Sequence, residues 1–171
     1  MPRLAHWSTL FAGAALSAQA ALAADPTPAS HATTVIGTMN PLLAEGSEAL
    51  ERGRFEDGIR LTLAGLQEPA SVHDRAAGHS NICAGYAALK RFAEALDHCN
   101  KALELDPRNW RTYNNRAAVF VGLKRFDLAM TDVNAGLEIA PDSATLLKSR
   151  DVVRQHDNAA KRERWRKPDR A

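Results

Sequence analysis

Residues 79–107 read HSNICAGYAALKRFAEALDHCNKALELDP, and residues 113–141 read YNNRAAVFVGLKRFDLAMTDVNAGLEIAP. The two runs match at one constant offset of 34 residues. The matched pairs include Asn81 with Asn115, Phe92 with Phe126, Ala95 with Ala129, Leu103 with Leu137, and Pro107 with Pro141. Self-similarity at such a period indicates a repeat architecture, in which each unit buries its apolar face against its neighbours.

Within each run, small and large apolar residues recur at helical spacing. Small residues stand where two helix axes must come close, at Cys83, Ala95, Ala102 and, one period later, Ala117, Ala129, Gly136. Large residues form the apolar face between them: Ile82, Tyr86, Leu89, Leu96, Leu103 and Leu105. The pattern predicts a helical hairpin in each unit.

These residues resemble the tetratricopeptide repeat, whose pattern is W-x2-L-G-x2-Y, then A-x3-F, then P. In the first run the pattern falls on His79, Ile82, Cys83, Tyr86, Ala95, Cys99 and Pro107. In the second it falls on Tyr113, Arg116, Ala117, Phe120, Ala129, Val133 and Pro141. The resemblance implies two antiparallel helices per repeat, the first of which lines a concave groove. Arg116 departs from it, because that place is normally apolar, and we expect its stem to lie over the packing seam.

A weaker copy precedes these two, since Gly53 to Ile59 resembles Lys90 to Leu96 at an offset of 37 residues. Asn40 before Pro41, and Ser71 three residues before Asp74, predict helix starts. After Pro141 one more amphipathic helix follows, as expected for a solvent-facing cap. The predicted fold is an all-α, right-handed α-solenoid of three helix-turn-helix repeats and a C-terminal capping helix. Its domain covers residues 39–161, with repeats at about 39–72, 76–109 and 110–143, the capping helix at 144–161 and a basic tail at 162–171.

The N-terminus has the layout of a secretory signal peptide. Arg3 precedes a small and apolar run from Leu10 to Ala23, which ends in the A-x-A sequence that signal peptidases cleave. We expect residues 1–23 to be a signal peptide cleaved near Ala23, and the mature chain to be exported, into a bacterial periplasm. Retention of the run as an anchor is the alternative. Residues 24–38 are rich in Pro, Thr, Ala and Ser, which predicts a disordered linker.

The formal net charge of +2 hides a basic C-terminus. Its cations are Lys161, Arg162, Arg164, Arg166, Lys167 and Arg170, against Glu163 and Asp169. Such a tail could contact anionic lipid headgroups, although we favour a solvated helix end, and Trp165 is the one residue that suits an interface. Nucleic acid is not an expected partner of an exported protein.

The two cysteines fall on the two helices of the middle repeat. In an antiparallel hairpin Cys83 and Cys99 lie at about the same height, and an oxidising compartment would preserve a disulfide between them. The closed loop would stabilise the fold by about 3 kcal/mol in the chain-entropy model. Two buried thiols are the alternative. His79, four residues before Cys83, could complete a Cys2His metal site, but bulky packing is its favoured role, and we predict no metal.

Motifs of catalysis are missing from the sequence. It contains no G-x-S-x-G, no H-E-x-x-H and no glycine-rich phosphate loop. The remaining histidines (His31, His73, His98, His156) are expected in the linker, in loops and on helix exteriors. We therefore predict no enzyme activity and no cofactor.

The concave groove is the predicted binding site. Its expected lining is Asn81, Ala84, Arg111, Asn114, Asn115, Ala118 and Lys148. The asparagines can donate to and accept from a peptide backbone, and Arg111 and Lys148 can hold a carboxylate. Some relatives of this family clamp chaperone C-termini with K-x3-N, N and K-x3-R. Here only Asn81 is in register, because Leu43, Ser47 and Asn115 replace clamp residues.

These features predict a non-catalytic adaptor that holds a peptide or helix of a partner protein in its groove. The alternatives are a structural subunit that assembles through the solenoid ends, and a thiol- or metal-responsive module built on Cys83, Cys99 and His79. The sequence specifies neither the partner nor the oligomeric state.

Overall fold

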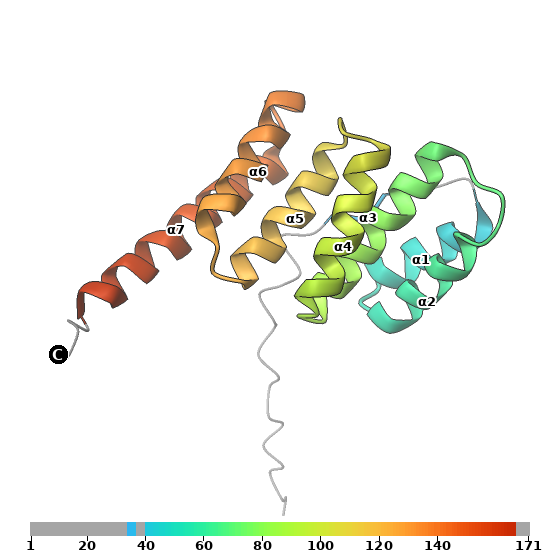
Figure 1. Cartoon of the computed structure of the whole chain (residues 1–171), viewed down its shortest axis with the longest axis horizontal. Coiled ribbons are helices and arrows are strands. Elements are labelled where there is room, and N and C mark those ends of the chain that lie inside the picture. Colours follow the sequence, from blue (N-terminus) through green and yellow to red (C-terminus); the bar gives the residue numbers. More distant parts are fainter. Residues whose placement is uncertain (1–33, 37–39, 167–171) are drawn as a thin grey trace, which may run out of the picture.

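A computed structural model describes residues 34–36 and 40–166. This part of the chain contains seven helices and no strand. The helices are α1 (Pro41–Glu51), α2 (Phe55–Gly65), α3 (Val72–Ala88), α4 (Phe92–Leu105), α5 (Trp110–Gly122), α6 (Phe126–Ile139) and α7 (Ala144–Arg166). They form three antiparallel hairpins followed by α7 (Figure 1).

The hairpins stack in chain order, so each packs only against its neighbours. The first helices of successive hairpins also touch directly, α1 with α3, α3 with α5, and α5 with α7. This row of helices forms one layer, and α2, α4 and α6 form the other (Figure 1). The predicted all-α repeat fold is therefore confirmed.

The helix boundaries follow the local signals in the sequence. Asn40 caps α1, with its Oδ1 accepting from the Leu43 amide at 3.2 Å. Ser71 caps α3, with its Oγ accepting from the Asp74 amide at 3.0 Å. Each hairpin turns through one residue with left-handed backbone, and this residue is Gly53, Lys90 and Lys124 in turn. The same turn is thus built three times.

Helix α7 is longer than the predicted capping helix and continues to Arg166. Leu146, Ser149 and Val153 bury its first half against the stack. Beyond them the helix projects past α6, and Trp165 is 87 % exposed (Figure 1). The first five residues assigned to a basic tail, 162–166, are therefore helical, and the last five lie outside the described residues.

Small residues fill the places where helices approach most closely. Ala95, Ala102, Ala117 and Ala129 are at most 1 % exposed. A Cβ added at Gly122 would come within 2.4 Å of the Phe92 ring, so the end of α5 fits against α4 only because it carries no side chain there. Close packing of this kind leaves little tolerance for added volume.

A disulfide joins the two helices of the middle hairpin. Cys83 on α3 and Cys99 on α4 have an S–S distance of 2.04 Å and a Cα–Cα distance of 5.2 Å. That Cα separation lies within the range that a bridge requires. Both residues are fully buried among Ala87, Ala95 and Val119. The crosslink therefore lies in the apolar core and at the centre of the stack.

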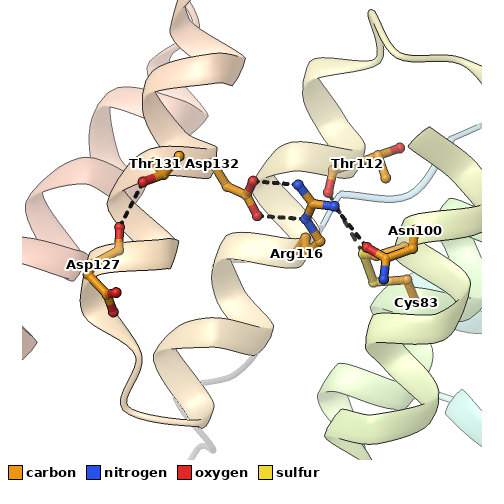
Figure 2. Close-up of polar contacts among 8 residues, drawn as sticks. Cys83, Asn100, Thr112, Arg116, Asp127, Thr131 and Asp132 are labelled. Carbon is orange, nitrogen blue, oxygen red and sulfur yellow. Dashed lines mark hydrogen bonds and ion pairs between the residues drawn. A yellow bond between two sulfur atoms is a disulfide. The ribbon is translucent and has the colours of Figure 1, made fainter. Parts of the chain in front are cut away.

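Arg116 does not simply lay its stem over the seam, as the sequence suggested. Its Nε and Nη2 donate to the Asp132 carboxylate on α6 at 2.8 and 2.7 Å, and its Nη1 donates to Asn100 on α4 at 2.8 Å (Figure 2). The Asp132 side chain is only 5 % exposed. Ile82 stands at the equivalent place one repeat earlier. A buried ion pair thus replaces apolar packing, and Arg116 links three helices across two repeats.

We expect removal of one partner of the ion pair to destabilise the fold strongly. Replacement of both partners by apolar side chains should destabilise it much less. Arg116→Ile leaves the buried Asp132 carboxylate without its cation and should lower the free energy of unfolding by about 3–5 kcal/mol. The double variant Arg116→Ile, Asp132→Leu should recover most of this loss, because two apolar side chains can pack together. Urea unfolding of the single and double variants measures both effects.

The matched control is the exposed pair Lys101–Asp97 on α4. Lys101→Ala should change the free energy of unfolding by less than about 1 kcal/mol. If Arg116→Ile costs no more than Lys101→Ala, the buried pair does not stabilise the third hairpin.

Candidate functional site

A segment of the chain itself lies against the face formed by α1, α3 and α5. Thr34, Val35 and Ile36, called here the groove segment, cross the first helices of the repeats. At its N-terminal end, the Thr34 amide donates to Oδ1 of Asn115 on α5 at 2.5 Å. Nδ2 of Asn115 donates back to the Thr34 carbonyl at 2.9 Å. One asparagine amide therefore satisfies both backbone groups of one residue.

Asn81 on α3 repeats this arrangement two residues further along the groove segment. Its Oδ1 accepts from the Ile36 amide at 2.6 Å, and its Nδ2 donates to the Ile36 carbonyl at 2.7 Å. The same carbonyl accepts from Ser47 Oγ on α1 at 2.8 Å. Alternate residues of an extended chain present their backbone groups on the same side. Asn81 and Asn115 thus bind the groove segment as an extended chain.

The two asparagines are also held by neighbouring repeats. Nδ2 of Asn81 donates to Ser47 Oγ at 2.8 Å, and Nδ2 of Asn115 donates to Ser80 Oγ at 3.2 Å. Ser149 on α7 donates to Oδ1 of Asn114 at 2.7 Å. Asn81 and Asn115 are 0 % exposed. Their amide planes are therefore fixed by the scaffold, which orients them toward the backbone they bind.

The other residues predicted for the groove differ in their surroundings. Ala84 is buried and Ala118 is half-buried, whereas Arg111 and Lys148 are exposed. The guanidinium of Arg111 lies over the Trp110 ring, 4.5 Å from its centroid. Beside the groove segment a cleft of about 360 Å³ opens, lined by Val35, Ile36, His73, Asp106, Arg108, Asn109, Trp110 and Arg111. Arg111 thus lies at the rim of the groove and not under the groove segment.

The prediction of disorder for residues 24–38 does not hold for Thr34, Val35 and Ile36. The Thr34 and Ile36 amides find partners 81 and 45 residues away in the sequence, which composition alone does not reveal. A local signal was present, since Thr-Thr-Val-Ile is a β-branched run inside a Pro- and Ala-rich stretch. The rest of that linker and the predicted signal peptide, residues 1–23, lie outside the described residues.

His98 was expected on a helix exterior, but it is half-buried against His79. The two Nδ1 atoms are 3.0 Å apart, so one ring donates to the other, and the Tyr86 ring lies beside His98. Because both Cys83 and Cys99 are in the disulfide, neither offers a thiolate to a metal. Within residues 34–36 and 40–166 no group of three or more His, Cys, Asp or Glu side chains is placed to hold a metal ion.

Comparison with known proteins identifies one repeat of the chain. Residues 76–109, which form the middle hairpin, match the family model of the tetratricopeptide repeat. The middle hairpin is therefore a tetratricopeptide repeat. Comparison with curated protein sequences finds no match.

Solved structures show the same fold around this tetratricopeptide repeat. The first TPR domain of human RPAP3 is 22 % identical, covers 71 % of this chain and 93 % of its own, and has a TM-score of 0.63. The first TPR of Spaghetti (RPAP3), bound to the HSP90 peptide SRMEEVD, is 24 % identical over 67 % and 88 %, with a TM-score of 0.59. The Hsp90 co-chaperone Cns1 of Saccharomyces cerevisiae is 22 % identical over 74 % and 41 %, with a TM-score of 0.67.

None of the helices between residues 40 and 166 combines the length and the apolar character that crossing a bilayer requires.

The histidine pair makes stability depend on pH. Burial, followed by the charges of His79 and Lys101, lowers the pKa of His98 from 6.5 to about 4, while Asp97 opposes the change. Burial is also the main cause that lowers the pKa of His79. Between about pH 4 and pH 6.5 the unfolded chain therefore binds a proton that the folded chain does not bind. The free energy of unfolding decreases as the pH falls through this range.

We expect His98→Leu to flatten this part of the pH dependence. Urea unfolding at a series of pH values from about 7.5 to about 4 measures it, and His73→Leu, at an exposed position, is the control. An equal loss of stability in His98→Leu and in the unaltered chain would show that the pair does not titrate in this way.

Proposed function

We propose that this chain is an exported, non-catalytic adaptor that holds an extended segment of a partner protein in its concave groove. The observation that carries the proposal is the pairing of two buried amides, Asn81 and Asn115, with the backbone of an extended chain. Four hydrogen bonds to two alternate residues, donated and accepted in pairs, form a peptide-binding surface. The fold adds support, because the Spaghetti (RPAP3) TPR of similar fold was solved with a bound peptide.

The groove favours an internal segment over a free C-terminus. A clamp for a terminal carboxylate needs several cations that converge inside the groove. Here Leu43 is fully buried, and Ser47 donates to a backbone carbonyl. The cations Arg111 and Lys148 are exposed at the surface. The hydrogen bonds of Asn81, Asn115 and Ser47 inside the groove are thus directed at the backbone, and Arg111 and Lys148 can contact only side chains at the rim.

Capture of a partner should depend on the two amides. The bait is the chain from Ala24 carrying Thr34→Pro and Ile36→Pro, so that its own segment lacks the two N–H groups that Asn115 and Asn81 accept. Adding Asn81→Ala and Asn115→Ala removes both donor–acceptor pairs and should weaken capture from envelope extract by roughly tenfold or more. Quantitative mass spectrometry of the retained proteins measures this.

Asn134→Ala is the matched control, because Asn134 is an exposed asparagine on the second helix of the third repeat. It should leave capture unchanged. Equal capture by the bait with and without Asn81 and Asn115 would exclude the groove as the binding site. Self-association that persists in both baits without any captured protein would favour the structural-subunit alternative.

Export is the second part of the proposal. It is supported by the signal-like residues 1–23 and by the Cys83–Cys99 disulfide, which an oxidising compartment preserves. We expect intact-mass analysis of the protein isolated from cell envelopes to give a chain that starts near Ala24 and has no free thiol. A full-length chain with two alkylatable thiols, recovered from the cytoplasmic fraction, would contradict export.

A further inference from the structure

The groove segment makes the same contacts that a bound peptide would make. Its two outer residues use all four backbone bonds that Asn81 and Asn115 offer, and the Ile36 carbonyl also takes the Ser47 hydroxyl. A partner cannot use these groups while the groove segment holds them. The question is therefore whether Thr34–Ile36 is a fixed part of the fold or a ligand that can be exchanged.

We propose that residues 34–36 are a built-in ligand of the groove, which an extended segment of a partner must displace, and that they define the ligand class. This ligand is an extended chain with a hydroxyl residue, then a β-branched apolar residue, then a residue bound through its backbone N–H and C=O. The inference rests on the proposed function, since it describes the ligand of the same site.

The side chains of the groove segment define this preference. Thr34 Oγ1 accepts from Nδ2 of Asn114 at 3.3 Å, so the first position selects a hydroxyl group. Val35 packs against the apolar cluster of Leu50, Ile59 and Ile82, so the second position selects an apolar side chain. The groove binds the N–H and C=O of Ile36, and Ile36 also lines the cleft beside the groove segment. The third position is therefore defined by its backbone groups.

Several features favour exchange over permanent packing. The groove segment is short, its three residues are only half-buried, and its contacts to the repeats are mostly hydrogen bonds to its backbone. Short segments with few buried apolar contacts open at the lowest free-energy cost. The three repeats and α7 pack against each other without it. Its removal thus exposes the groove and leaves the stacked helices in contact.

The short stretch of chain between Ile36 and Asn40 keeps the groove segment near its site. Asn40 caps α1 at the edge of the groove, four residues after Ile36. A short tether gives an effective concentration on the order of millimolar, so even a weak intramolecular ligand occupies the groove most of the time. A partner's apparent dissociation constant is then raised by the inverse of the fraction of open groove. Releasing the groove segment should lower that constant by about tenfold or more.

The test measures binding of a fluorescent peptide with the sequence of residues 30–40 to the chain from Ala24. Ile36→Pro in the protein removes the N–H that Asn81 accepts, so the groove opens and the peptide should bind about tenfold or more tightly than to the unaltered chain. Ala29→Pro is the matched control. It adds a proline to the same stretch of sequence at a residue outside both the groove segment and the peptide, so this variant should bind the peptide as the unaltered chain does.

Peptide variants test the ligand class. Proline in place of the residue that corresponds to Ile36, or aspartate in place of Val35, should each weaken binding to the Ile36→Pro protein by about tenfold or more. Amide hydrogen exchange of the unaltered chain is a second measurement that needs no variant. The Thr34 and Ile36 amides should exchange more slowly than the Val35 amide.

Equal peptide binding by the unaltered and Ile36→Pro proteins would overturn the proposal, as would loss of the folded state in Ile36→Pro. Equally fast exchange of all three amides would also overturn it. These outcomes are separable from failure of the proposed function. If a partner is captured through Asn81 and Asn115 equally well with native Thr34 and Ile36, the function stands and the built-in ligand does not. If the peptide binds as described but no partner is captured, the built-in ligand stands alone.

Discussion

Close approach of neighbouring helices is the constraint on which the rest of the structure depends. A single hairpin of this sequence has an apolar face that it cannot bury alone, so it is folded only when another hairpin packs against it. Packing at short interaxial distance requires alanine, glycine or cysteine at the contact points, and those residues recur with the period of the repeat. The same spacing brings α1, α3 and α5 together and so determines the distance between Asn81 and Asn115.

The distance between Asn81 and Asn115 determines which backbone groups of an extended chain the two amides can bind. Buried amides are costly unless their donors and acceptors are paired. Neighbouring serines pair part of each amide, and the remaining donor and acceptor face an extended backbone. Because every residue type has the same backbone groups, such recognition provides affinity with little sequence discrimination. Discrimination is left to Asn114, to the apolar cluster beside Val35 and to the charges at the rim.

The period, the small residues and the capping signals predicted most of the fold, because repeats and caps are local or strictly periodic in sequence. The period also put Asn81 and Asn115 at equivalent positions of successive repeats. Three features were not predictable in this way. The bidentate pairing of Arg116 with Asp132, the contact of His79 with His98, and the placement of Thr34–Ile36 all join residues through side-chain geometry or across a long stretch of chain. Periodicity says which face a residue occupies, but it does not say which partner it meets there.

The position of the disulfide has a consequence for how the molecule opens. In a linear stack of repeats, unfolding begins at the ends, where a hairpin has only one neighbour. The Cys83–Cys99 crosslink lies in the middle hairpin, so opening from either end stops where it meets a unit that cannot separate its two helices. Asn81 belongs to that unit, whereas Asn115 and Ser47 belong to the hairpins on either side. The groove therefore opens first at its outer contacts, Asn115 and Ser47, and last at Asn81.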